Sequence, residues 1–235
     1  MVLYRTLVET AWRRIKLNKN FIITIVGSTG SGKSYGALWL AERIDPHFSI
    51  ENICFSPYDF MKLINDHMTG KKILPKGSVI IIEEAGIQYS ARAWSSFNNK
   101  MLGMISQSFR SMNWVFIFTL PTFAWFEKQA RELTHLILDA MDRIDYRQGK
   151  AYFRINELRS DHFTGDLRLS YPWIIKKDGE RARIKVIALG KPSKRLRDAY
   201  EKLKVGFQVH VSGDLFQRAT EYEFKMLKRK PTSNI

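Results

Sequence analysis

Phe21-Ile22-Ile23-Thr24-Ile25-Val26-Gly27-Ser28-Thr29-Gly30-Ser31-Gly32-Lys33-Ser34 is the stretch that decides the fold of this 235-residue chain. It opens with an apolar, β-branched run, which is typical of a buried strand. A glycine-rich turn follows, and residues 33–43 then carry apolar side chains at helical spacing. A glycine, four residues and Gly-Lys-Ser between a strand and a helix form the pattern of a phosphate-binding loop, the P-loop. The sequence therefore predicts a strand, a loop that binds phosphate and a helix.

The residue types in this loop have a physical reason. Gly30 and Gly32 let successive backbone N–H groups point toward one anion, and the start of the helix adds the positive end of its dipole. We expect Lys33 to meet the β- and γ-phosphates of a nucleotide and the Ser34 hydroxyl to ligate Mg²⁺. The predicted nucleotide-binding residues are Gly27, Ser28, Thr29, Gly30, Ser31, Gly32, Lys33, Ser34 and Tyr35.

Two glutamates follow a second buried strand. Val79 to Ile82 is fully apolar and leads into Glu83 and Glu84. Because ligands bind at the carboxyl ends of parallel strands, we expect both carboxylates to lie beside the phosphate loop. We expect Glu83 to hold Mg²⁺, directly or through water, and Glu84 to orient and deprotonate the attacking water. Two adjacent acids at this place favour hydrolysis over transfer of the phosphoryl group to an acceptor.

A further apolar strand, predicted over residues 114–120, carries a hydroxyl close to its end. We expect this side chain, Thr119, to lie next to the acidic pair and to sense the γ-phosphate through water. Arg110 precedes the strand, and Arg131 lies on the next predicted helix. Either guanidinium could reach the nucleotide of a neighbouring subunit and stabilise charge there during phosphoryl transfer. The sequence leaves the choice between them open.

Strand and helix patterns alternate over roughly the first 135 residues, which predicts a mainly parallel central sheet with helices on both faces, an α/β fold. Besides the strands already described, the pattern predicts a strand at 50–55 and helices at 59–67, 94–109 and 125–133.

The pattern changes after Thr134. Residues 136–146 and 151–158 flank a turn and predict an antiparallel hairpin. Residues 167–177 and 181–189 flank Asp178-Gly179-Glu180 and predict a second hairpin with an Asp-Gly turn. A terminal helix is predicted over residues 192–204.

These patterns divide the chain into three parts. Residues 1–20 are predicted to form a basic amphipathic helix. Residues 21–190 form the nucleotide-binding domain, with a core at 21–146 and a hairpin extension at 147–190. Residues 191–235 form a helical and basic C-terminal tail.

Composition limits the classes of function. The 38 basic and 23 acidic residues give a net charge of +15, which favours a polyanionic partner, either nucleic acid or an anionic membrane surface. No window of 18 uninterrupted apolar residues predicts a membrane-spanning helix. The charges near the N-terminus follow the apolar residues, which is the wrong order for a signal peptide, so we expect a cytoplasmic protein. The single cysteine, Cys54, excludes an intramolecular disulfide.

Two other nucleotide-binding classes fit less well. A small GTPase needs a base-reading Asn-Lys-x-Asp at a late strand end, whereas Asn18-Lys19-Asn20-Phe21 precedes the phosphate loop and lacks the aspartate. A nucleoside or nucleotide kinase would have an arginine-rich lid and a single acid serving the acceptor. It remains an alternative without a clear motif.

The loop at 27–34, the strand that ends in Glu83-Glu84 and the strand that ends at Thr119 together resemble the additional-strand P-loop ATPases. Within these, the chain resembles the FtsK–HerA superfamily, particularly the Zot-like and viral genome-packaging ATPases. These features occur in an order similar to that of the Zot-like ATPases, with Ser108-Phe109-Arg110 before the strand that ends at Thr119 and Arg131-Glu132-Leu133 after it.

The resemblance implies a RecA-like fold, ATP and Mg²⁺ as cofactors, and a homo-oligomeric ring, usually a hexamer, that moves double-stranded DNA or assists assembly. Together with the charge, it leads us to expect an ATPase that translocates double-stranded DNA during viral genome packaging, with a capsid or membrane-associated partner. The alternative is a Zot-like ATPase that assists virion or conjugative assembly or export at a membrane.

Overall fold

The computed structural model describes residues 3–83, 103–104, 110–126, 128–161, 163–175 and 179–229. Glu84 lies outside the described residues, and so does most of the helix predicted at 94–109.

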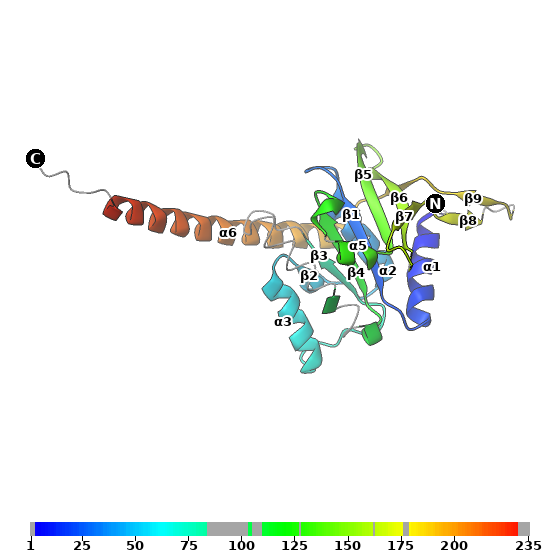
Figure 1. Cartoon of the computed structure of the whole chain (residues 1–235), viewed down its shortest axis with the longest axis horizontal. Helices are drawn as coiled ribbons and strands as arrows, with labels where there is room; N and C mark the ends of the chain where they lie inside the picture. The colour runs from blue at the N-terminus through cyan, green and yellow to red at the C-terminus, as the bar shows by residue number, and fades with distance from the viewer. Residues whose placement is uncertain are drawn as a thin grey trace, which may run out of the picture.

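A mainly parallel sheet forms the centre of the molecule (Figure 1). Strand β1 (Phe21–Val26) lies between β5 (Leu136–Asp145) and β4 (Val115–Leu120), and β3 (Val79–Ile82) and β2 (Ile53–Cys54) continue the sheet beyond β4. Each of these neighbours is paired in parallel. The carboxyl ends of the five strands therefore meet at one edge.

One strand, β4, is inserted between the strand before the phosphate loop and the strand before the acidic pair. This is the additional strand that the sequence led us to expect. Ile82 pairs with Phe118, so Glu83, just past the end of β3, lies level with Thr119, the next-to-last residue of β4. The insertion thus places the Thr119 hydroxyl beside Glu83.

Helices cover both faces of the sheet because both faces of its central strands are apolar. One core cluster joins Ile23, Ile81 and Ile117 to helices α1 (Leu3–Lys16) and α2 (Lys33–Ile44). The other cluster uses the alternate strand residues and packs them against α3 (Pro57–Met68). Alternating side chains of a strand point to opposite faces, so one apolar run supplies both clusters. The expected RecA-like α/β fold is confirmed.

Antiparallel strands extend the sheet beyond β5. Strand β6 (Lys150–Ser160) pairs with β5, as the first predicted hairpin requires. The second predicted hairpin differs from the structure in its pairing. Its outer parts, β7 (Leu167–Ser170) and β10 (Val186–Leu189), both pair with β6.

Only the inner parts of that second hairpin, β8 (Trp173–Ile175) and β9 (Arg181–Arg183), pair with each other. Proline lacks a backbone N–H to donate to a ladder, and Pro172 separates β7 from β8. A single ladder over the whole segment is therefore interrupted there.

Two further elements differ from their predicted bounds, and a third was not predicted. The predicted strand at 50–55 is a 3-10 turn, η1 (Ile50–Asn52), followed by the short β2. The predicted helix at 125–133 is divided into η3 (Phe123–Trp125) and α5 (Lys128–Glu132). Another 3-10 turn, η2 (Arg110–Met112), precedes β4.

The terminal helix is far longer than predicted. Helix α6 spans Lys194–Arg229, and its second half projects away from the rest of the molecule (Figure 1). Leu196, Tyr200 and Val211 are buried, but between residues 212 and 222 every described side chain is half-buried or exposed. None of the described helices has the length and hydropathy needed to cross a membrane.

Because of His135, just before β5, the free energy of unfolding should depend on pH in a predictable way. Its Nδ1 accepts a hydrogen bond from the Ile22 backbone N–H at 3.0 Å, and the Arg14 guanidinium lies 2.6 Å from its Nε2. Desolvation, together with the positive charge of Arg14, lowers the pKa of His135 from 6.5 to about 3. The unfolded chain binds this proton below about pH 6.5 and the native chain does not.

We therefore expect the free energy of unfolding to fall between pH 7 and pH 5, with a slope approaching about 1.4 kcal/mol per pH unit at the acid end. Urea unfolding of the wild type and of His135→Gln over this range measures the effect. The variant, which cannot take up the proton, should lose less stability toward pH 5. Parallel profiles for the two proteins would contradict the assignment.

Candidate nucleotide-binding site

The phosphate loop leaves β1 in a conformation that only glycine tolerates at two positions. Gly27 has φ +145°, and a Cβ atom there would lie 2.6 Å from the Cβ of Ala140. Gly32 has φ +90° in the left-handed region and stands directly before α2. The crest of the loop between them, Ser28 to Gly30, is exposed. The loop is thus tightly held at its base and open at the side where a ligand would bind.

Lys33 reaches back over the loop. Its Nζ donates hydrogen bonds to the carbonyl oxygens of Gly27 and Ser28, both at 2.7 Å. The ammonium group therefore lies on the concave side of the loop. This is the position expected of a lysine that meets the outer phosphates of a nucleotide.

A bulge in the β5–β6 hairpin supports the loop from the other side. The register of the two strands shifts between Ala140 and Ile144, and Asp142 within the bulge has φ +51°. The Ser28 hydroxyl donates a hydrogen bond to Oδ1 of Asp142. Bulges redirect a side chain out of a regular ladder, and this one turns a carboxylate toward the loop.

The acid after β3 is held by two hydroxyl groups from distant parts of the chain. Glu83 is 5% exposed, and its Oε2 accepts a 2.6 Å hydrogen bond from Thr119. Its Oε1 accepts a 3.0 Å hydrogen bond from the hydroxyl of Tyr200, on α6. Tyr200 and Ser34 also line the same pocket. Tyr200 therefore contacts the acid and borders the pocket beside the phosphate loop.

The oxygen donors at this place fit a magnesium ion. Ser34 and Glu83 offer the hydroxyl and carboxylate oxygens that Mg²⁺ prefers, and such ions keep phosphate and water as their other ligands. The described residues contain no cluster of three histidine, cysteine or acidic side chains, so a cage made of protein ligands alone is absent from them. The Ser31 hydroxyl oxygen, inside the loop, is buried without a hydrogen-bond partner among the described residues. An unpaired polar atom at this place also fits a polar ligand.

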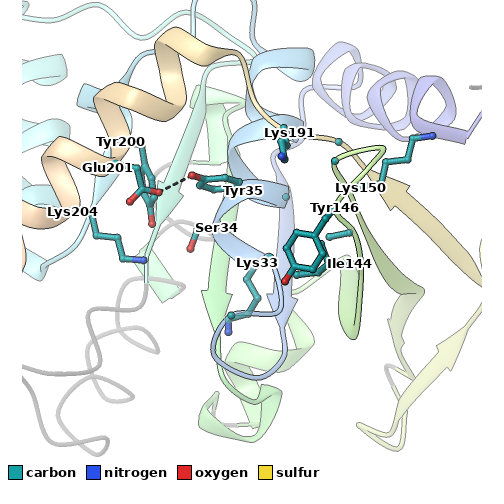
Figure 2. A pocket seen from close by; sticks show the side chains of 16 residues that line it. Lys33, Ser34, Tyr35, Ile144, Tyr146, Lys150, Lys191, Tyr200, Glu201 and Lys204 are labelled. Atoms are coloured by element: carbon teal, nitrogen blue, oxygen red, sulfur yellow. Dashed lines mark hydrogen bonds between the residues drawn. The ribbon is translucent and has the colours of Figure 1, made fainter.

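A pocket of about 430 Å³ opens beside the loop (Figure 2). Tyr35 and the phosphate loop form one wall, and Tyr200 and Glu201 of α6 form another. The Tyr35 hydroxyl donates a 2.9 Å hydrogen bond to Glu201. Burial is the main cause that raises the pKa of Tyr35, and this hydrogen bond is the next. The pocket is lined by the lysines Lys33, Lys150, Lys191 and Lys204. Its mixture of cations and aromatic rings suits an anionic ligand that carries a flat ring.

The structure brings most of the predicted residues together. Lys33, Ser34, Glu83 and Thr119 meet at the carboxyl edge of the sheet. The function of Thr119 as a sensor, and the division of work between Glu83 and Glu84, stay predictions.

The two candidate arginines are not part of this cluster of contacts. Arg110 begins η2, before β4, so its backbone is at the opposite edge of the sheet from the phosphate loop. Arg131 lies on α5, half-buried, and its Nε is buried without a partner among the described residues. A function for either one at the site of a neighbouring subunit stays a prediction.

The sequence pattern did not reveal the residues that α6 and the β5–β6 turn contribute to the site. These are Tyr146, Lys150, Tyr200, Glu201 and Lys204. The only sequence signal for them was the position of Lys150 in a turn that follows a core strand. Tyr200 had no signal, because 117 residues separate it from Glu83.

The comparison with curated proteins gave no match. Among solved structures, this chain is similar to a DNA polymerase III gamma subunit-related protein from Thermotoga maritima, with 11% identity and a TM-score of 0.42. That match covers 60% of this chain and 47% of the other, so this chain spans about half the length of that protein.

Two other structures are similar over most of their own length. The N-terminal domain of zonular occludens toxin from Neisseria meningitidis has 13% identity and a TM-score of 0.36, over 65% of this chain and 94% of the other. A KaiC-like protein from Pyrococcus horikoshii has 12% identity and a TM-score of 0.33, over 72% and 89%. Every one of these TM-scores is below 0.5, so the family has to be decided by the sequence.

The sequence profile of one family matches this chain. The profile described as zonular occludens toxin (Zot) matches residues 40–162, which is just over half of the 235 residues. The matched range contains β3, Glu83, β4 and Thr119, and it begins in α2, a few residues after the phosphate loop. The resemblance seen in the sequence is thereby confirmed, and the chain belongs to the zonular occludens toxin (Zot) family of P-loop NTPases.

Proposed function

We propose that this protein binds ATP together with Mg²⁺ and hydrolyses it. The observation that carries the proposal is that Tyr200, whose hydroxyl donates to Glu83 at 3.0 Å, lines the same pocket as Lys33 and Ser34, so the acid and the phosphate loop border one site. Lys33 lies on the concave side of the same loop. A triphosphate held there would face a cation on one side and the metal ligands on the other.

The described residues would act mainly by position and charge. Lys33 and the backbone N–H groups of the loop would hold the phosphates, and Ser34 and Glu83 would hold Mg²⁺. When bound, the metal neutralises charge on the phosphate oxygens. Thr119 fixes the Glu83 carboxylate with a short hydrogen bond. Glu84, the next residue, would orient the water that attacks the γ-phosphate.

We further propose that hydrolysis drives movement of double-stranded DNA through a homo-oligomeric ring in the cytoplasm, as in the packaging of a viral genome into a capsid. The net charge of +15 supports a polyanionic partner. In such a ring, Arg110 or Arg131 would supply the charge that stabilises phosphoryl transfer in the adjacent subunit. Motors of this kind grip the phosphate backbone and do not need to read bases.

A second candidate, an ATPase that assists assembly or export at a membrane, is favoured by the β8–β9 hairpin. On one face of this hairpin Trp173 pairs with Arg183 and Ile175 pairs with Arg181, and Trp173 and Ile175 are 54% and 69% exposed. The Arg183 guanidinium lies 4.6 Å from the Trp173 ring. Aromatic, aliphatic and basic side chains on one exposed face suit an anionic lipid surface.

One experiment chooses between these two candidates. We expect duplex DNA to stimulate ATP hydrolysis, and the DNA affinity to fall steeply with salt, by about a thousandfold between 50 and 200 mM if six phosphates are contacted. The measurement is the steady-state ATPase rate with duplex DNA and with vesicles that contain anionic lipid. Arg181→Ala and Trp173→Ala test the hairpin: a DNA contact depends mainly on the arginine, and a lipid contact on both residues. Stimulation by the vesicles alone would contradict the DNA motor.

A further inference from the structure

The β5–β6 turn carries an exposed tyrosine beside the phosphate loop. We propose that Tyr146 binds the base of the nucleotide, with the flat face of the base stacked on the tyrosine ring. This inference rests on the proposed ATP-binding function, and it adds the place of the base to a site that the phosphate loop and the acid define only at the phosphates.

The order of the strands sets the direction in which a nucleotide would lie. The phosphate loop follows β1, and β1 has β4 on one side and β5 on the other. Glu83, which is predicted to hold the metal at the outer phosphates, follows β3, beyond β4. Because a triphosphate is a linear chain, one whose outer end faces Glu83 has its nucleoside end toward β5. The β5–β6 turn lies on that side of the loop.

The β5–β6 hairpin continues past the edge of the sheet and packs on the phosphate loop. Val26, the last residue of β1, pairs with Asp139, whereas β5 runs on to Asp145. A Cβ atom on Gly32, directly before α2, would lie 3.0 Å from the Cβ of Ala151 on β6. The hairpin is thus in contact with the loop, and residues of its turn line the same pocket.

The turn has a fixed backbone and leaves the ring of Tyr146 exposed. A carboxylate oxygen of Asp145 accepts a 2.9 Å hydrogen bond from the backbone N–H of Gln148, and Asp145 pairs with Lys150 across the ladder. Tyr146 is 79% exposed, so its ring contributes little to the core and is available to a ligand. A tyrosine with only two rotatable side-chain bonds loses little freedom when it binds.

The two other tyrosines of the pocket are engaged elsewhere. Tyr200 is 1% exposed, with its ring packed in the core, and the Tyr35 hydroxyl is bound to Glu201. Both belong to the side of the pocket that faces α6, whereas the Tyr146 ring lies on the other side of the loop, next to Ile144, as Figure 2 shows. Tyr146 is therefore the aromatic ring that a base at the nucleoside end would meet.

Residues 190 and 191 form another wall at this end of the pocket. A Cβ atom on Gly149 would lie 3.0 to 3.2 Å from three carbons of the Lys191 side chain, so this side chain crosses the turn. A Cβ atom on Gly190 would clash with the indole of Trp39, so the backbone there is held close against α2. A base stacked on Tyr146 would thus be bordered by the turn and by residues 190–191.

The first test is Tyr146→Ala, measured with two ligands in the presence of Mg²⁺. A non-hydrolysable ATP analogue carries the base, and inorganic tripolyphosphate does not. We expect the variant to bind the analogue about fivefold to a hundredfold more weakly than the wild type, the usual contribution of a base stacked on an aromatic ring. It should bind tripolyphosphate as the wild type does. Tyr146→Phe, which keeps the ring, should retain the wild-type affinity for both ligands.

Tyr222→Ala is the matched control, because it removes an exposed tyrosine near the end of α6. It should bind both ligands as the wild type does. Thermal unfolding of the three variants checks that each is folded.

The second test needs no variant, so the inference stays testable if Tyr146→Ala folds poorly. An ATP analogue that carries a photoreactive azido group on the adenine is crosslinked to the wild type, and the labelled peptides are mapped by mass spectrometry. We expect the label on residues 144–151 or 190–191, and we expect excess ATP to prevent it. A label that falls only on other segments would overturn the inference.

The outcomes separate the base site from the proposed function. The base site would be overturned, while phosphate binding stands, by unchanged analogue binding in a folded Tyr146→Ala or by an equal loss for both ligands. A wild type that binds tripolyphosphate as tightly as the analogue would have the same consequence. A wild type that binds neither ligand would overturn the proposed function and the base site with it.

Discussion

Lys33→Ala should lose ATP binding by roughly a thousandfold, and with it all measurable hydrolysis. One unit charge about 4 Å from another contributes about 4 kcal/mol at the effective dielectric constant of a partly exposed protein site. Lys33 is half-buried on the concave side of the loop, where it is the cation that a β- or γ-phosphate would meet. Alanine removes that charge and leaves the backbone of the loop in place.

The measurement is an equilibrium titration with a fluorescent ATP analogue in the presence of Mg²⁺. Lys71→Ala is a suitable control, since it removes an exposed lysine beyond the end of α3 and keeps the same net charge as Lys33→Ala. Thermal unfolding of both variants checks that each is folded. Wild-type affinity in a folded Lys33→Ala would show that the nucleotide, if any, binds elsewhere.

Glu84→Gln should bind ATP as the wild type does and hydrolyse it about 10² to 10⁴ times more slowly. That range is the usual contribution of a positioned general base. Glutamine has the size of glutamate and cannot accept the proton of the attacking water. Because Glu84 lies outside the described residues, its role rests on its place directly after Glu83 in the sequence.

Glu83→Gln is the matched partner of this variant. It removes a negative charge one residue away, at the carboxylate that Thr119 and Tyr200 hold, and we expect it to weaken the dependence of ATP binding on Mg²⁺. Single-turnover hydrolysis and a Mg²⁺ titration on both variants show which acid orients the attacking water and which one holds the metal. If Glu84→Gln hydrolyses at the wild-type rate and Glu83→Gln does not, the roles we assign to the pair are reversed.

The centre of the site could be predicted because its signals are local. The residues of β1, β3 and β4 are apolar on both faces, and such short runs between turns are typical of buried parallel strands. The loop after β1 spaces its glycines, lysine and serine as a P-loop does, and few other sequences share that pattern. Once the strands are parallel, the polar residues at their carboxyl ends must meet, so the closeness of Glu83 and Thr119 followed from the pattern alone.

The outer parts of the site could not be predicted, because they depend on contacts between distant segments. Nothing near Tyr200 in the sequence distinguishes it from an ordinary core residue of an amphipathic helix. Asp142 reaches Ser28 only because the β5–β6 ladder bulges, and the alternation of residues 136–146 does not show where a bulge lies. The length of α6 was underestimated because its apolar stripe becomes irregular where it leaves the core, and Gly206 and Gly213 interrupt it.

The most direct measurement of the central claim is a crystal structure of this protein with a non-hydrolysable ATP analogue and Mg²⁺. The account predicts the triphosphate on the backbone N–H groups of residues 30–34, the metal between Ser34 and Glu83, and Lys33 turned from the Gly27 and Ser28 carbonyls toward the outer phosphates. A nucleotide bound away from this loop, or a metal that contacts neither Ser34 nor Glu83 directly or through water, would contradict it.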